Sequence, residues 1–189
     1  VRKKVLDAFI PDPAFANQWK EKSGHPYESA STRHAKARGG TKGVIDLLSS
    51  YPKHSTNAEE CCWCLLVMAS ESEEANDFRE RLIEREHVTP LIVAAFKRGI
   101  KKLHYGAMKQ SIGLLYYLSK DQPKKYLNTL IQDYNLMILC GQTLKICIRG
   151  LSKLKQQNKN SAKASVFGDL CELGANLIYE LIKHKAGKS

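Results

Sequence analysis

Six cysteines are the residues of this sequence with the clearest capacity for chemistry. Cys61 and Cys64 have a CxxC spacing, but a structural zinc site needs about four ligands. No second CxxC and no pair of histidines follows at a suitable distance. All six lie in apolar runs that are typical of helix interiors: Cys61, Cys62, Cys64, Cys140, Cys147 and Cys171. We therefore expect free, buried thiols, no metal and no cofactor, in the cytoplasm or another reducing intracellular compartment.

The other residues that could do chemistry form no recognisable catalytic pattern. The six histidines are scattered: His25, His34, His54, His87, His104 and His184. The acidic cluster from Glu71 to Asp77 opens a helix, where carboxylates suit the positive end of the helix dipole. Phosphate-loop, dinucleotide, HExxH and GxSxG motifs are all missing from the sequence. We expect a protein that is not an enzyme, with a single unrecognised cysteine nucleophile as the catalytic alternative.

Length and composition indicate one folded domain. The chain has 189 residues, 43% of them hydrophobic and 26% charged, which is typical of a folded protein. Its richest apolar run, from Cys61 to Ala69, is far shorter than the roughly 18–20 residues of a membrane span. The chain begins at Val1 rather than Met, so we expect part of a larger chain or complex.

Apolar periodicity predicts helices throughout the chain from Thr41 onward and no β-strand. The boundaries follow from prolines, glycines and Asn57, an expected N-cap; Gly99 and Gly150 are expected helix ends. Residues 1–40 are expected to be an irregular basic arm or cap, with a short helix at Val1–Ile10, and residues 186–189 a tail. The expected helices are Thr41–Ser50, Asn57–Ala69, Glu74–Glu86, Thr89–Arg98, Leu103–Lys120, Pro123–Tyr134, Leu136–Leu154 and Ser161–Lys185.

The predicted helices recur in one order, which indicates an internal repeat. Phe78, Leu82 and Ile83 match Tyr126, Leu130 and Ile131 at a shift of 48 residues. A longer apolar helix recurs at a shift of 50 and again at a further 63, matching three sets of residues: Cys64, Leu65 and Met68; Leu114, Leu115 and Leu118; Leu177, Ile178 and Leu181. Each unit is too small to bury its own apolar faces, so we expect neighbouring units to stack.

These units resemble armadillo repeats, within the armadillo/HEAT-like group. Asn57–Ala69 (NAEECCWCLLVMA) resembles the third helix of that motif, with its acidic start and Ala-Trp-Ala-Leu-like core. Phe78–Gly99 (FRERLIEREHVTPLIVAAFKRG) resembles the preceding helices, with an acidic turn and a Pro-Leu-Val helix closing on Lys/Arg-Gly. The resemblance covers residues 41–185, as an incomplete unit (41–69), a complete one (70–119) and a stretched one (120–183). It implies an all-α, right-handed α-solenoid of helix triplets, whose third helices line a groove that binds proteins.

The resemblance also implies which residues line the groove. In import-receptor members a groove Trp is followed four residues later by an Asn that holds the peptide backbone. The corresponding pairs here are Trp63 and Val67, Gly113 and Tyr117, and Asn176 and Glu180, so the Trp–Asn ladder is absent. We expect a shape-based partner instead, contacted by these positions and Lys109. Tyr117 is the expected anchor of the groove.

Positive charge is concentrated in part of the chain. The formal net charge is +11, but residues 58–86 carry nine acidic and three basic side chains. Many cations are expected in loops between second and third helices, where stacking would align them along one basic edge: Lys97, Arg98, Lys101, Lys102, Arg149, Lys153 and Lys155.

Such an edge could bind an acidic or extended protein segment, an anionic lipid surface or nucleic-acid phosphates. Aromatic side chains that could stack on bases are almost lacking among these cations. We therefore predict a protein-interaction scaffold or adaptor. The alternative is a basic helical-repeat protein that binds RNA within a ribonucleoprotein assembly.

Overall fold

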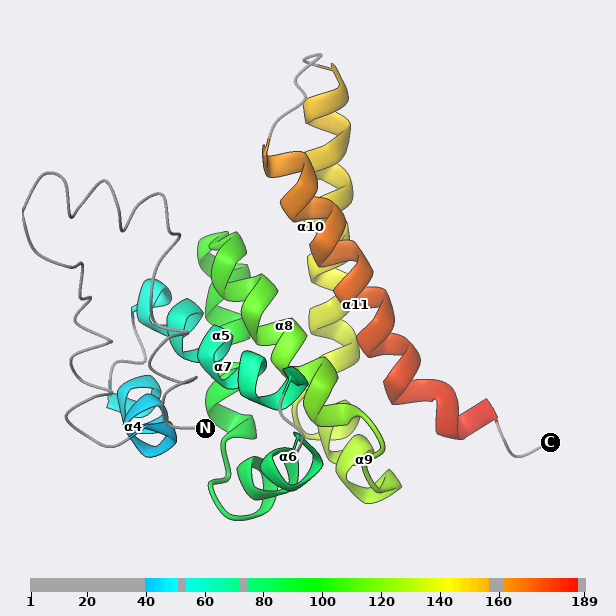
Figure 1. Cartoon of the computed structure of the whole chain (residues 1–189). Coiled ribbons are helices and arrows are strands. Elements are labelled where there is room, and N and C mark those ends of the chain that lie inside the picture. Colours follow the sequence, from blue (N-terminus) through cyan, green and yellow to red (C-terminus); the bar gives the residue numbers. More distant parts are fainter. Residues whose placement is uncertain (1–39, 51–53, 72–74, 157–161, 187–189) are drawn as a thin grey trace, which may run out of the picture.

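The computed structural model describes residues 40–50, 54–71, 75–156 and 162–186, and these residues form eight α-helices and no β-strand (Figure 1). The all-α prediction is therefore confirmed for this part of the chain. The predicted helix at Val1–Ile10 and the basic arm lie outside the described residues, apart from Gly40. The helices are α4 (Thr41–Ser50), α5 (Ser55–Glu71), α6 (Ala75–Glu84), α7 (Thr89–Lys102), α8 (Tyr105–Ser119), α9 (Lys124–Gln132), α10 (Leu136–Gln156) and α11 (Ala162–Ala186).

Several predicted helix boundaries are wrong. Asn57 is not the N-cap of α5, which begins two residues earlier at Ser55. Leu103 does not begin α8; it ends α7 in the left-handed conformation, with φ of 52°. The N-cap of α8 is His104, whose Nδ1 accepts a hydrogen bond from the Ala107 amide at 3.2 Å.

Four connections between helices use a left-handed residue that is not glycine. His87, Leu103, Asp121 and Asn135 have φ values of 47°, 52°, 56° and 54°. Asp, Asn and His adopt this conformation more readily than most residues. These connections reverse the chain within a few residues, so consecutive helices fold back on each other.

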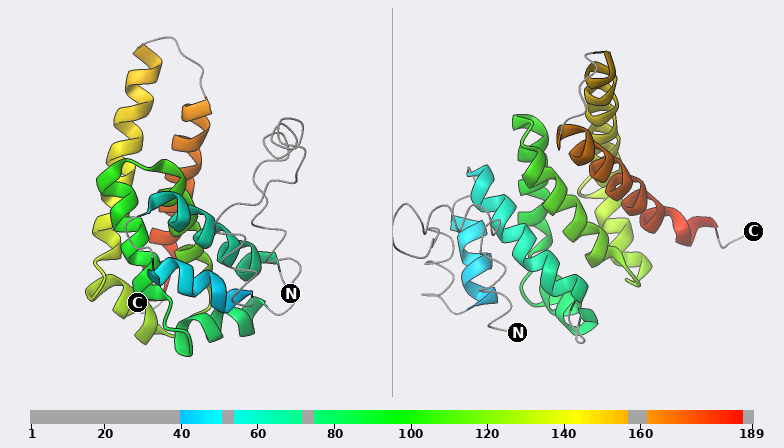
Figure 2. Two further views of the ribbon diagram at one scale, coloured as in Figure 1. Left: turned by 90° about the vertical axis from the view of Figure 1, so that its left-hand side faces the viewer. Right: turned by 45° about the horizontal axis from the view of Figure 1, so that its top comes forward.

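Three long helices, α5, α8 and α11, lie side by side with α8 in the middle (Figure 1). They run in the same direction, whereas α7 packs on α8 and α10 packs on α11 in the opposite direction (Figures 1 and 2). The short helices α6 and α9 lie at the lower side of the molecule in Figure 1. The α7–α8 and α10–α11 connections lie at its upper side.

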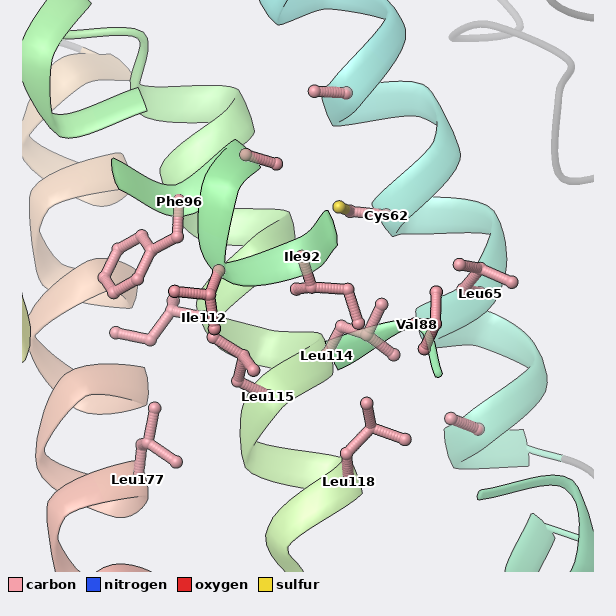
Figure 3. Packing of buried hydrophobic residues seen from close by; sticks show 14 of the residues in the cluster. Cys62, Leu65, Val88, Ile92, Phe96, Ile112, Leu114, Leu115, Leu118 and Leu177 are labelled. Carbon is pink, nitrogen blue, oxygen red and sulfur yellow. The ribbon is translucent and has the colours of Figure 1, made fainter. Parts of the chain in front are cut away.

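One apolar core joins these helices. Figure 3 shows Leu65 of α5, Ile92 and Phe96 of α7, Ile112 of α8 and Leu177 of α11 converging in it. Eight of the nine residues of the repeated set in α5, α8 and α11 are buried, and Ile178 is partly buried against the same core. The shifts found in the sequence therefore match positions with the same packing role.

Gly99 and Gly150 are not helix ends, contrary to the prediction, because α7 and α10 continue past them. Both glycines allow close contact between helices instead. A Cβ at Gly99 would lie 2.9 Å from Met108 Cγ of α8. A Cβ at Gly150 would lie 2.6 Å from Cζ of Phe167 in α11, a ring that packs edge-on against Tyr105 at 5.0 Å.

Replacing Gly150 with alanine is expected to lower the free energy of unfolding by about 1–2 kcal/mol. The added methyl group collides with the buried Phe167 ring, and overpacking costs about 1–3 kcal/mol, offset by about 1 kcal/mol of helix propensity. Gly141 of α10 is the matched control, because a Cβ there meets no atom within 4 Å. Gly141→Ala should stabilise the protein by about 0.5–1 kcal/mol. Urea unfolding of both variants measures the difference, and equal shifts would contradict the contact at Gly150.

Candidate functional site

The side chains of α5, α8 and α11 that are not fully in the core form a continuous surface, named here the three-helix face. The α5 members follow each other at helical spacing, as do those of α8 and α11, so each helix presents one stripe. The face comprises Glu59, Trp63, Leu66 and Val67 of α5, Lys109, Gly113, Tyr116, Tyr117 and Lys120 of α8, and Asp169, Leu173, Asn176, Glu180 and Lys183 of α11.

The centre of the face is apolar and tightly packed. Gly113 stands in the middle of the α8 stripe, and a Cβ there would lie 3.2 Å from Leu66 Cδ2 and 3.8 Å from Leu173 Cδ1. Leucines from α5 and α11 thus close over the α8 backbone where a side chain is missing. Both leucines are only partly buried, so this centre offers apolar surface to a partner.

Polar contacts join the helices at the upper end of the face. Lys109 of α8 donates to Asp169 of α11 at 2.5 Å. Glu59 of α5 lies 3.6 Å from Nδ1 of His104 and covers the backbone at Gly106. Burial raises the pKa of the Glu59 carboxyl; nearby His104 opposes this rise and the Glu60 charge adds to it.

Two tyrosines and a lysine occupy the lower end of the face. The Tyr116 and Tyr117 rings lie 5.2 Å apart, and the Lys120 ammonium lies 4.8 and 4.7 Å from their centroids. Beneath them, buried Arg79 of α6 donates to the Tyr117 carbonyl at 3.4 Å and to Asn76. A cation there suits the negative end of the α8 dipole, so Arg79 and Lys120 hold the aromatic pair in place.

The structure brings the seven predicted groove residues onto this one face, but they differ in accessibility. Trp63, Val67, Lys109, Tyr117 and Asn176 are partly exposed. Gly113 is buried, and Glu180 is buried beside Lys183, with which it forms an ion pair. Only the first group can contact a partner through side chains.

The predicted basic edge lies in helices and not in loops, which corrects that part of the prediction. Lys97, Arg98, Lys101 and Lys102 belong to the C-terminal half of α7. Arg149, Lys153 and Lys155 belong to the C-terminal half of α10. Both helix ends point to the upper side of the molecule in Figure 1. All of these side chains are exposed except Arg98, which is partly exposed.

Five of the six cysteines are buried, and all six are free thiols inside α5, α10 and α11. Burial raises the pKa of Cys62, Cys64, Cys140 and Cys147 to about 12, and it raises that of Cys61 as well. An activated nucleophile needs the opposite shift. Among the described residues, no group of three or more His, Cys, Asp or Glu side chains could hold a metal ion.

Sequence reasoning missed Leu66, Leu173, Tyr116 and Lys120 as members of the face. The repeat alignment identifies equivalent positions, but it does not show that a glycine in α8 lets leucines from both neighbours meet above it. The i,i+3 and i,i+4 spacing of Tyr116, Tyr117 and Lys120 was a usable signal for the cation between the rings.

Comparison with known proteins adds no relative: no protein-family model, curated protein or solved structure matches the chain. Within the described ranges, no helix has the length and apolar character needed to cross a membrane.

Proposed function

We propose that this chain is an armadillo-like, right-handed α-solenoid that acts as a non-catalytic scaffold or adaptor and binds a segment of a partner protein on the three-helix face. The observation that carries the proposal is the alignment of α5, α8 and α11 into one surface with apolar and aromatic side chains exposed. The partner would be an extended segment with apolar residues and one or more acidic ones.

The repeat supports the solenoid part of the proposal. Positions that correspond in the sequence, such as Leu65, Leu115 and Ile178, face the same core from three parallel helices. The second-helix pair α7 and α10 is also in contact, as units stacked in one direction require.

The chemistry of the face supports the choice of partner. Trp63, Tyr116 and Tyr117 are partly exposed aromatic side chains, and residues of this kind provide most of the binding energy at protein interfaces. The Lys120 ammonium lies over two tyrosine rings, and no carboxylate in the described residues forms an ion pair with it. It is a suitable contact for an acidic side chain of the partner.

Loss of the Tyr117 ring is expected to weaken partner binding at least about tenfold, since truncation of an interface anchor costs about 2 kcal/mol or more. The probe is a peptide of about a dozen residues selected from a displayed library on the intact protein, with affinity measured by calorimetry. Tyr179→Ala is the matched control, because Tyr179 of α11 is 64% exposed and lies outside the three-helix face. Binding lost equally in both variants, or retained in Tyr117→Ala and Trp63→Ala, would contradict the proposed face.

A further inference from the structure

The upper part of α10 and the start of α11 form a projecting element without negative charge, named here the basic arm (residues 145–156 and 162–167). In Figures 1 and 2 this element extends beyond the other helices. From Tyr134 to Gly168 the sequence contains six lysines and arginines and no Asp or Glu. Within the described ranges, the cations of the arm form no ion pair.

The cations of the arm follow one face of the helix. Lys145, Arg149 and Lys153 are spaced four residues apart and are all exposed, so they stand in a row with a rise of about 6 Å between neighbours. Exposed polar side chains of Gln142, Ser152 and Gln156 lie along the same row. The helix dipole accounts for cations in the last turn, such as Lys153, but its effect does not extend back to Lys145 and Arg149.

This composition differs from that of a protein-binding surface. Protein interfaces are enriched in aromatic residues, Met and Arg and are depleted in Lys, whereas the exposed cations of the arm are four lysines and one arginine: Lys145, Arg149, Lys153, Lys155 and Lys163. Ile148 is the one large apolar side chain recorded as exposed on the described arm, which is too little apolar area to anchor an interfacial membrane helix. Rows of Lys and Arg with neighbouring Ser and Gln are typical of surfaces that contact nucleic-acid phosphates.

We propose that the basic arm binds the phosphate backbone of double-stranded RNA without reading its sequence. The arm has no exposed aromatic side chain for stacking on the bases of a single strand. One side of α10 is covered by α11, where Gly150 meets Phe167, so α10 is not free to enter the major groove of DNA. A-form RNA instead presents phosphates and 2′-hydroxyl groups across a wide, shallow groove, which suits a straight row of cations and amides.

The test measures binding of the full chain to fluorescent RNA duplexes of about 20 base pairs, in two unrelated sequences, by anisotropy. We expect equal affinity for both sequences, which falls steeply between about 50 and about 200 mM salt. Arg149→Glu/Lys153→Glu should weaken binding at least about tenfold and reduce the salt slope by about 2. Lys124→Glu/Lys125→Glu makes the same charge change at exposed sites of α9 and should change affinity less than about twofold if the arm is the site.

Four outcomes would overturn the proposal. They are no binding of either RNA at about 50 mM salt, equal losses in both charge-reversal variants, equal or tighter binding of a DNA duplex, and arm-dependent binding of a polyglutamate peptide or phosphatidylserine vesicles in place of RNA. Arg149→Gln/Lys153→Gln replaces the arm variant if Glu near the C-terminus of α10 prevents folding. Binding of the selected peptide should be unchanged in the arm variants, so failure here leaves the proposed function separately testable.

Discussion

Replacing Phe96 with alanine is expected to lower the free energy of unfolding by about 3–5 kcal/mol, a large share of the roughly 5–15 kcal/mol of a typical domain. Phe96 of α7 is fully buried in the core that joins α5, α7, α8 and α11. Its loss removes a large apolar side chain from water-free surroundings and leaves a cavity that neighbouring helices fill only in part. Urea denaturation monitored by circular dichroism measures the change.

Tyr179→Ala is the control for this substitution, because it also removes an aromatic ring. The Tyr179 side chain is 64% exposed, so we expect a change within about 0.5 kcal/mol. Similar losses at both positions would contradict the core described here.

Alkaline pH is expected to unfold the protein cooperatively within about two pH units above pH 9. Burial raises the pKa of Cys62, Cys64, Cys140 and Cys147 from 9.0 to about 12, and that of Cys61 in the same direction. Above pH 9 the unfolded chain therefore binds fewer protons than the folded one, and the free energy of unfolding falls as pH rises. The stabilisation is fully present below pH 9 and is lost towards about pH 12.

Each such thiol contributes a slope of about 1.4 kcal/mol per pH unit. Tyr126 adds to the loss above pH 10, because burial raises its pKa to about 12, although its hydrogen bond with Thr89 opposes the shift. Urea unfolding under reducing conditions, in steps from pH 7 to pH 10.5, measures the slope. Cys62→Ala should reduce it by one thiol, whereas Cys171→Ala, at a half-buried site, serves as the comparison. A midpoint that is constant over this range would contradict the burial of the thiols.

The helices could be predicted from sequence because their apolar periodicity is strong. α4 has the predicted bounds, and most of the others differ from the prediction by a few residues. Local signals misled where tertiary packing decides: Gly150 resembles a helix end, but it continues α10 because Phe167 needs the space. Leu103 carries no signal for the left-handed conformation that it adopts between α7 and α8.

The face could be predicted only in part. Repeat alignment placed Trp63 and Tyr117 on corresponding stripes, because equivalent helices present equivalent positions. It also placed Glu180 there, although this side chain is buried beside Lys183. Side-chain packing between helices determines accessibility, and one helix stripe carries no information about its neighbours.

Fluorescence of Trp63 tests the central claim, partner binding on the three-helix face, most directly. The chain has two tryptophans, so Trp19→Phe leaves Trp63 as the single reporter. Saturation with the selected peptide should shift Trp63 emission to shorter wavelength, because the partner covers a partly exposed indole, and RNA duplexes should leave it unchanged. Unchanged emission at peptide saturation would show that the partner binds elsewhere.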